Sequence, residues 1–597
     1  MLQQKQINTR IVLLGLMIGM FFSALEQTVV GTAMPTIIGE LNGFEIFAWV
    51  TTAYLITSTA VIPIVGKISD LFGRRYLYLT GMVIFIVGSA LCATATTMEQ
   101  LIIFRGIQGI GGGMIMPLSQ TIVGDIFTAE QRAKWQGVFG AIFGLSSVIG
   151  PLVGGFFVDT ISWHWIFLIN VPFGLLSAAL IFIGMKNEIV QNTKKVTIGY
   201  MSKISLIIAG ILLLIGLILG GDAFEWNSLE SYLIFGIPLF IFTLFGFIKR
   251  KDLNIDFFGI MTLIPALTIL LLGLTFGGDK FAWLSLTSYL IFGISILLMI
   301  IFIFIERITA EPILDLSLFK NRVFAATNGL GFLLGLGMFG AIMFVPMFMQ
   351  AILGVSPTEA GSTMTPMMIS LIVASVIGGR LLLRIKYRTN LTVGMIITSI
   401  GFFLMSTMGL ESTMWTAYGF MTVMGFGMGL VMPTLMIAVQ NAFPKEKLGA
   451  VTSASTFFRS IGGTIGVTIF NVVMNNTLTD KISNVTSEQS DPAVASTLSA
   501  IGNEPDDLFN ILITTPDELK EMLPIPEETL HGVVLAIKTA WSQSFSFVFL
   551  TGLSIIALGI FVALSVGNGR IKRDKKKSAI IGREKKEQGM KKELVTE

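Results

Sequence analysis

The stretch GIGGGMIMPLSQTIVGDIFTAEQ (residues 109–131) recurs in altered form as GFGMGLVMPTLMIAVQNAFPKEK (residues 425–447). The copies share residue types at a constant offset of 316 positions: Gly111, Gly113, Met116, Pro117, Phe127 and Glu130 recur as Gly427, Gly429, Met432, Pro433, Phe443 and Glu446. The first copy falls in the fourth apolar run of the chain and the second in the fourth of its last six runs. This internal repeat predicts two related bundles of six helices.

The apolar runs decide the class of protein. Of the 597 residues, 53% are hydrophobic and 13% are charged, about half the charged fraction of a soluble domain. Runs of about twenty apolar residues, the length that crosses ~30 Å of hydrocarbon, recur along almost the whole chain. We therefore expect an all-α polytopic membrane protein, monomeric and surrounded by membrane lipids.

Several kinds of chemistry are excluded by the same sequence. The glycine run at 109–114 lies within a span and follows no strand, and no G-x-x-x-x-G-K-[ST] motif occurs, so nothing points to a nucleotide site. The single Cys92 cannot form an intramolecular disulfide, and His164 and His531 lie far apart in the chain. We expect no metal, no cofactor, no enzymatic activity and no nucleic-acid partner.

The apolar runs predict about sixteen spans, at 11–33, 46–66, 76–97, 100–125, 135–158, 163–185, 203–220, 230–248, 257–276, 287–305, 323–351, 362–383, 391–409, 413–440, 448–474 and 541–566. If the N-terminus is cytoplasmic, all Lys and Arg residues but six lie on the cytoplasmic side. Four of the six lie outside, namely Lys280, Lys481, Lys520 and Lys538, and Arg105 and Arg459 lie within spans. The positive-inside rule thus predicts that both termini are cytoplasmic.

A second repeat lies in the middle of the chain. GGDAFEWNSLESYLIFGI (220–237) returns as GGDKFAWLSLTSYLIFGI (277–294), which indicates a duplicated helical hairpin. The predicted plan is an N-terminal six-helix bundle (1–190), central hairpins contributing about four extra spans (191–310), a C-terminal six-helix bundle (311–567) and a basic cytoplasmic tail (568–597). An acidic external loop at 475–540 is either a partly helical hairpin or flap over the outer mouth or a tolerated surface insertion.

Short motifs carry a family resemblance. GKISDLFGRR (66–75) follows the second span. LIIFRGIQGIGGG (101–113) lies within the fourth span, and GLSSVIGPLVGG (144–155) lies within the fifth. With LEQTVVGTAMP (25–35) and WHWIFLINVPFG (163–174), they resemble the major facilitator superfamily, in particular its drug:proton antiporter branch with fourteen spans, the EmrB/QacA type.

The resemblance covers about residues 8–475 and the last span, with three departures. Glu26 stands where the family usually has Asp, and His164 stands where the family usually has Arg. The chain also has two central hairpins, whereas the family has one. The copy at 255–305 runs into the following segment as the family's hairpin does, so we take 200–250 as the extra copy.

Glu26 is an unexpected charge in the first apolar run. A carboxylate at the centre of a membrane helix costs about 2.5–3.5 kcal/mol, so such residues usually face a cavity or a partner. Its neighbours three and four positions away are apolar except Ser23, and desolvation favours the protonated form. Glu26 is then either a neutral packing residue or a proton-exchanging group, and we favour proton exchange. Arg105 lies within ~3 Å of the same membrane depth, which makes it the natural counter-charge.

The remaining candidate residues fall into two groups. We assign conformational gating to Asp70, Arg74 and Arg75 at the inner face, and to Gly150, Pro151, Gly154 and Gly155 in the fifth span. A candidate pocket would include Gln108, Arg459, Phe22 and Met343. For Arg459 a site role and a structural role stay open, and the Met- and Phe-rich run around Met343 also fits ordinary packing.

The sequence favours proton-coupled efflux of lipophilic, often cationic drugs across the plasma membrane by alternating access. The alternative within transport is a dedicated proton-coupled exporter of a single compound, such as an antibiotic, a lipid or a metabolite. A membrane sensor or scaffold that transports nothing is a different class, and dye transport in everted vesicles under a pH gradient separates it from both.

Overall fold

The computed structural model describes residues 8–41, 48–185, 256–278, 281–309, 312–355, 357–488, 491–502, 505–513, 519–520 and 525–570. The first copy of the central hairpin, with its predicted spans at 203–220 and 230–248, lies outside the described residues, as does the basic tail beyond Arg570. Every other predicted span coincides with a helix. Within the described ranges, twelve helices are long and apolar enough to cross a membrane.

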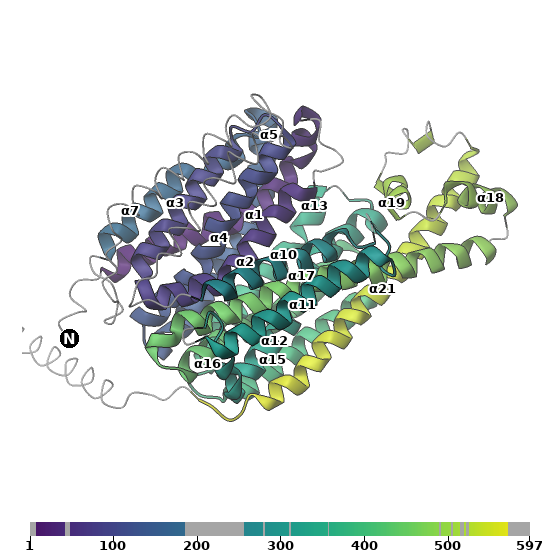
Figure 1. Ribbon diagram of the computed structural model, residues 1–597. Coiled ribbons are helices and arrows are strands. Elements are labelled where there is room, and N and C mark those ends of the chain that lie inside the picture. Colours follow the sequence, from purple (N-terminus) through teal and green to yellow (C-terminus); the bar gives the residue numbers. More distant parts are fainter. Residues whose placement is uncertain are drawn as a thin grey trace, which may run out of the picture.

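The N-terminal helices are α1 (Thr9–Leu41), α2 (Ala48–Phe72), α3 (Arg74–Cys92), α4 (Met98–Ile126), α5 (Ala129–Thr160), α6 (Trp165–Leu168) and α7 (Asn170–Gly184). The C-terminal helices are α12 (Arg322–Leu353), α13 (Pro357–Ser362), α14 (Met364–Leu381), α15 (Tyr387–Ser406), α16 (Met414–Ala442), α17 (Leu448–Glu488), α18 (Pro492–Ile501), α19 (Pro505–Ile513) and α21 (Glu527–Ser565). Figure 1 shows the two sets side by side, and α2, α4 and α5 contact α14, α16 and α17 across the boundary.

The repeated glycines explain how each bundle closes. The fourth helix of each half lies between two neighbours, and a methyl group on its glycines would collide with their backbones, so only glycine permits this approach. In the first half Gly109 and Gly113 face α2 and Gly111 faces α3; in the second half Gly425 and Gly429 face α14 and Gly427 faces α15. The repeat in the sequence is therefore a repeat of helix packing.

The second copy of the central hairpin is present as α10 (Phe257–Phe276) and α11 (Leu286–Ile308). Helix α10 contacts both α2 and α17, so the hairpin lies against the boundary between the two halves. Much of α11 is exposed and apolar, with Tyr289, Ile296 and Phe304 more than half exposed. This surface suits contact with lipid.

The segment 475–540, which the sequence predicts to be external and partly helical, contains helices in its described part. The boundaries at 474 and 541 fall inside α17 and α21, which run 41 and 39 residues and so extend to about 60 Å, twice the thickness of the hydrocarbon. Polar residues continue the helix in these extensions, as expected of a part that lies in water outside the hydrocarbon. Helices α18 and α19 pack on these extensions, and α19 also contacts α12 (Figure 1); the flap interpretation stays a prediction.

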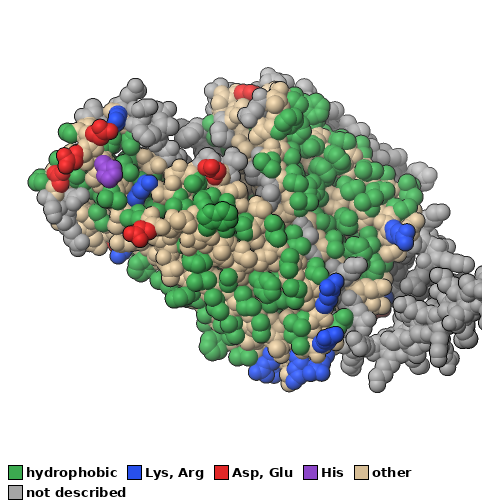
Figure 2. Space-filling view, turned by 180° about the vertical axis from the view of Figure 1, so that it is seen from behind, with side chains coloured by type: hydrophobic (Ala, Val, Ile, Leu, Met, Phe, Trp, Pro, Cys, Tyr) green, Lys and Arg blue, Asp and Glu red, His purple; other side chains and the backbone are tan. Residues whose placement is uncertain are grey.

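Charges are distributed unevenly over the surface. Figure 2 shows a broad apolar band, with more of the basic side chains near one end of this face and most acidic side chains near the other. The acidic end carries the external helices, in agreement with the eleven acids and three lysines of residues 475–540. This distribution is the one on which the predicted orientation depends.

Candidate functional site: two charge clusters and a central cavity

Glu26 is completely buried at the centre of the N-terminal bundle. Arg105 Nη1 lies 2.5 Å from Glu26 Oε1, and Asn170 Nδ2 donates to Oε2 at 2.5 Å. Arg105 Nη1 also donates to Gln108 Oε1 at 2.6 Å. The pairing of Glu26 with Arg105 that follows from their depths is present, and these residues with Ser89 form what we call the Glu26 cluster.

Hydrogen bonds and a contact with an aromatic ring hold the Glu26 cluster in place. Ser89 Oγ accepts hydrogen bonds of 2.9 Å from both Gln108 and Asn170, so α3 joins α4 to α7. Arg105 Nε donates to the carbonyl of Val50 at 3.2 Å, and its guanidinium lies 4.4 Å from the centroid of the Tyr54 ring. A charge pair removed from water in this way needs such hydrogen bonds to offset the loss of hydration.

Helix α5 fixes the opposite side of α1. A methyl group at Gly150 would collide with Thr28, and one at Gly154 would press on the α1 backbone at Val29, whereas Gly155 faces open space. Pro151 lies in α5 beside Gly150. The helix that carries Glu26 is thus packed directly against two of the glycines to which the sequence assigns gating.

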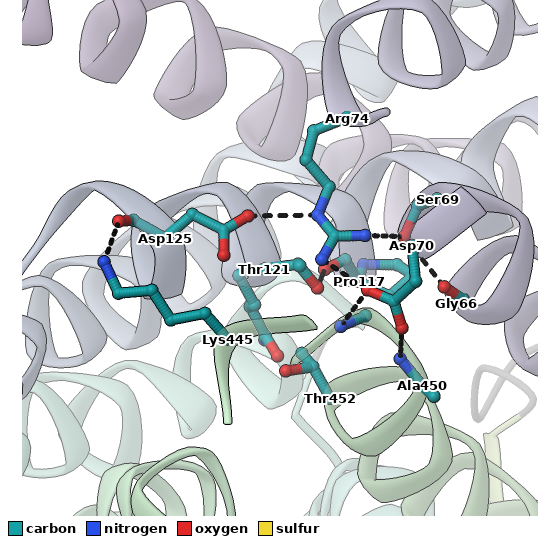
Figure 3. Close-up of polar contacts among 12 residues, drawn as sticks. Gly66, Ser69, Asp70, Arg74, Pro117, Thr121, Asp125, Lys445, Ala450 and Thr452 are labelled. Carbon is teal, nitrogen blue, oxygen red and sulfur yellow. Dashed lines mark hydrogen bonds and ion pairs between the residues drawn. The ribbon is translucent and has the colours of Figure 1, made fainter. Parts of the chain in front are cut away.

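A second cluster lies where α2 and α4 end and α3 begins, and we call Asp70, Arg74 and Asp125 the inner-face cluster, after the orientation that the sequence predicts (Figure 3). Arg74 is fully buried and forms ion pairs with Asp70 and, at 3.0 Å, with Asp125. Asp70 also accepts hydrogen bonds from the backbone N–H groups of Gly449 (2.9 Å) and Ala450 (2.8 Å). These amides are in the first turn of α17, where the helix dipole favours an anion, so Asp70 joins the two halves.

The other half has a counterpart of this cluster whose own residues carry no charge, although Arg132 Nη1 of α5 lies 3.5 Å from its Asn441 Oδ1. Asn441 corresponds to Asp125 in the repeat, and Tyr387 begins α15 as Arg74 begins α3. Asn441 Nδ2 donates to the Tyr387 hydroxyl at 3.0 Å, where the first half has an ion pair. The two corners therefore share a position in the fold but differ in charge.

A central cavity of about 120 Å³ lies between the halves. Its lining comes from α1, α4 and α5 on one side and from α12, α14, α16 and α17 on the other. Gln27, the residue after Glu26, faces this cavity, and so does Arg459 from α17. Neighbouring residues of α1 thus serve the buried cluster and the cavity.

The sequence matches the profile of the Major Facilitator Superfamily over residues 16–316 and again over 306–467. The chain belongs to the Major Facilitator Superfamily. Its relatives include multidrug transporter protein MdtP of Bacillus subtilis (strain 168), 43% identical over 94% of this chain and 93% of that protein. Multidrug resistance protein 3 of the same organism is 36% identical over 95% of this chain and 97% of that protein.

Solved structures show the same fold. The crystal structure of the human organic anion transporter MFSD10 aligns with a TM-score of 0.54 over 94% of this chain and all of that chain, at 13% identity. The prediction of a multi-pass, all-α Major Facilitator Superfamily fold is therefore confirmed. Assignment to the branch with fourteen spans stays a prediction, since the extra hairpin copy lies outside the described residues.

Some candidate residues of this Major Facilitator Superfamily chain lie apart from both clusters and the cavity. Arg75 Nη2 donates to the carbonyl of Phe182 at 3.0 Å and points toward α7. Phe22 stacks on Phe173 with centroids 4.3 Å apart, and Met343 is 50% exposed. Neither Phe22 nor Met343 is among the described residues that line the cavity.

Sequence reasoning did not single out Asn170, Ser89 or Asp125. Asn170 is a polar residue within the apolar WHWIFLINVPFG motif, and that contrast is the signal that could have found it. His164, in the same motif, stacks on Trp163 and hydrogen-bonds Ser162, away from the Glu26 cluster. Within the described ranges, no group of three or more His, Cys, Asp or Glu side chains is placed to hold a metal ion.

Proposed function

We propose that this protein exports lipophilic small molecules from the cell in exchange for protons. Its membership of the Major Facilitator Superfamily and its similarity to two relatives named for multidrug transport or resistance support drug efflux. The observation that carries proton coupling is Glu26, a fully buried carboxylate whose neighbour Gln27 lines the central cavity. The protein then acts as a monomer in the plasma membrane, with both termini in the cytoplasm.

The coupling step follows from the charge balance of the Glu26 cluster. While Glu26 is ionised, its charge compensates that of Arg105. Protonation removes this compensation and leaves a buried guanidinium, which is costly in a medium of low polarity. The cluster must then rearrange toward water, and movement of α1 also displaces Gln27 at the cavity. Proton and cargo thus act on the same helix.

Alternating access requires that each ligand favour a different arrangement of the halves. The inner-face cluster supplies a closed arrangement, because Asp70 holds the start of α17. We assign Asp70 and Arg74 to gating, and the glycines of α5 to the movement of α1. Cargo binding in the cavity and a proton arriving at Glu26 would alternately close and release the inner face.

The available driving force is adequate for such a cycle. One pH unit supplies about 1.4 kcal/mol per proton, and one elementary charge moving across 100 mV supplies about 2.3 kcal/mol. Coupling free energies between sites are typically about 1–3 kcal/mol, which lies in the same range. A single buried carboxyl can therefore drive the export of a monovalent compound.

The test uses everted membrane vesicles that accumulate a lipophilic fluorescent dye when a pH gradient, acid inside, is imposed. Glu26→Gln should abolish accumulation driven by the gradient, because the amide cannot exchange a proton. Glu40→Gln is the matched control: Glu40 is on the same helix but exposed, and it accepts a hydrogen bond from Trp163 at 2.7 Å. Gradient-driven accumulation by Glu26→Gln at the wild-type rate would refute the proposal.

A further inference from the structure

Arg459 is the one ionisable side chain among the described residues that line the central cavity. It is partly buried on α17, and no charged side chain of the described structure lies close enough to act on it. An unpaired guanidinium away from water is costly, and such a charge is ordinarily paired with an anion. The cavity therefore presents a positive charge that the rest of the described structure does not balance.

The buried acids of the two bundles already form ion pairs. Glu26 is bound by Arg105 and Asn170, and Asp70 and Asp125 are bound by Arg74. Among the buried carboxylates in the described part of these bundles, none is left to pair with Arg459 without breaking one of these ion pairs. The anion that would match Arg459 must then come from outside the protein.

The remaining lining suits a molecule with a polar head and an apolar body. Gln120 is more than nine-tenths buried, and its Oε1 has no hydrogen-bond partner in the described part of the chain. Methionines form much of the apolar wall, and Met116 and Met432 occupy equivalent positions of the repeat on α4 and α16. Methionine is flexible and polarisable, so this wall adapts to apolar groups of different shapes.

We propose that the central cavity binds amphipathic monovalent anions, above all lipophilic carboxylates, with the anionic head on Arg459. This inference rests on the proposed export function and names its substrate class. It replaces the expectation of often cationic drugs, because a cation would meet an uncompensated positive charge. Arg459 supplies a planar pair of donors that matches a carboxylate, and Gln120 Oε1 is left to accept a hydrogen bond from an N–H or O–H group elsewhere on the cargo.

The charge of the cargo sets how the membrane potential acts. Exchange of one proton for one cation moves no net charge, and exchange for a neutral compound moves one charge inward. Exchange for an anion moves two charges inward, each worth about a 50-fold concentration ratio at 100 mV. Export of a carboxylate is therefore expected to depend strongly on a potential that is negative on the cytoplasmic side.

Binding is measured first, on the full-length protein in nanodiscs, with three probes that share one fluorophore. These are N-dansyl-aminohexanoate, its neutral methyl ester and a trimethylammonium analogue of the same length. We expect the carboxylate to bind more tightly than the cation. Arg459→Gln should weaken carboxylate binding about 10- to 100-fold, as for loss of a hydrogen bond to a charged group, and leave the ester unchanged.

Arg459→Lys is the matched variant, since it keeps the charge and should retain most of the carboxylate preference. Unchanged binding of the ester shows that each variant is folded. Equal binding of carboxylate and cation by the wild type would overturn the inference, as would an Arg459→Gln protein that keeps the carboxylate preference.

Transport separates failure of the inference from failure of the proposed function. Proteoliposomes receive a pH gradient, with or without a potassium diffusion potential set by valinomycin. Acceleration of carboxylate export by the potential, with no acceleration for the cation, supports the inference. Absence of gradient-driven transport for all three probes would refute proton-coupled export, while the binding measurements would still decide what the cavity takes.

Discussion

Asp70→Asn removes the charge that joins α2 to the first turn of α17. In the structure both carboxylate oxygens of Asp70 accept hydrogen bonds from α17, at 2.9 and 2.8 Å, and Asp70 also pairs with Arg74. An asparagine of the same size offers one neutral acceptor in place of two charged ones. Arg74 keeps its ion pair with Asp125, so the loss falls mainly on the contact between the halves.

The size of the effect follows from these contacts. A hydrogen bond to a charged group is worth about 1.5–3 kcal/mol and one between neutral groups about 0.5–1.5 kcal/mol. The favourable position of the carboxylate at the helix N-terminus adds about 0.3–1 kcal/mol. When the halves separate, water replaces part of this, so we expect a net loss of about 2 kcal/mol. That shifts the equilibrium toward an open inner face about 30-fold.

The assay measures exposure of a cysteine at the contact. Cys92 is the single native cysteine and is replaced by serine. Ser453→Cys then provides a thiol on α17 at a position that is 1% exposed and adjoins Gly66 of α2. A membrane-impermeant maleimide added to everted vesicles should label this thiol about 30-fold faster when Asp70→Asn is also present.

A matched control isolates the gating contact from a general loss of charge. Asp315 lies 2.9 Å from Lys447 just before α17, but both side chains are partly exposed, so Asp315→Asn should change the labelling rate less than about fivefold. Labelling of the Asp70→Asn protein at the wild-type rate would refute the idea that Asp70 holds the inner face closed. Equal acceleration by both variants would refute its specificity.

Two further predictions concern stability. The first is that Gly109→Val lowers the melting temperature in detergent by several degrees. The valine side chain must enter space held by the α2 backbone at Tyr54 and by Thr57, which costs about 1–3 kcal/mol. Gly155→Ala, which faces open space, should leave the melting temperature unchanged. The second concerns pH: burial opposes ionisation of Asp315, but hydrogen bonds from Ser317 and Lys447 outweigh burial and lower its pKa. Because the folded-state pKa is the lower one, this stabilisation is present above the unfolded value of about 3.9 and is lost as the pH falls through the folded value. Wild type should therefore exceed Asp315→Asn by about 0.2–1 kcal/mol at neutral pH and match it in strong acid; an unchanged difference in acid would contradict this origin.

The features that the sequence could predict are those that depend on a residue's own span. The length of an apolar run fixes whether it crosses a membrane, so spans and bundles follow from hydropathy and the repeat. The pairing of Glu26 with Arg105 could also be predicted, because each residue has a depth within its own span. Depth alone does not tell which way a side chain points from its helix, however. The sequence therefore placed Phe22 and Met343 in a pocket, whereas the described lining of the cavity contains neither.

Other contacts depend on the tertiary arrangement. The partner of Asp70 on α17 is a backbone amide 379 residues away, and a backbone amide has no signature in the sequence. The continuation of α17 and α21 beyond the membrane was missed because hydropathy marks where lipid ends, not where a helix ends. For Arg459, the sequence shows a charge in a span, whereas only the packed structure shows that no charged side chain of the described residues lies close to it and that the buried acids of the bundles are already paired.

The unequal corners of the two halves bear on how long the inner face stays closed. Arg74 with Asp125 makes a charged corner, while Tyr387 with Asn441 makes a neutral one. Each additional 1.4 kcal/mol in a closing contact lengthens the closed interval about tenfold, and one pH unit returns only about that much per proton. On the proposed cycle, a second carboxylate joined to the facing half, as Asp70 is joined to α17, would slow every turnover more than the gradient could repay. The Tyr387–Asn441 corner supplies no such carboxylate, so the inner face is held by the Asp70 contact and the proton gradient is sufficient to release it.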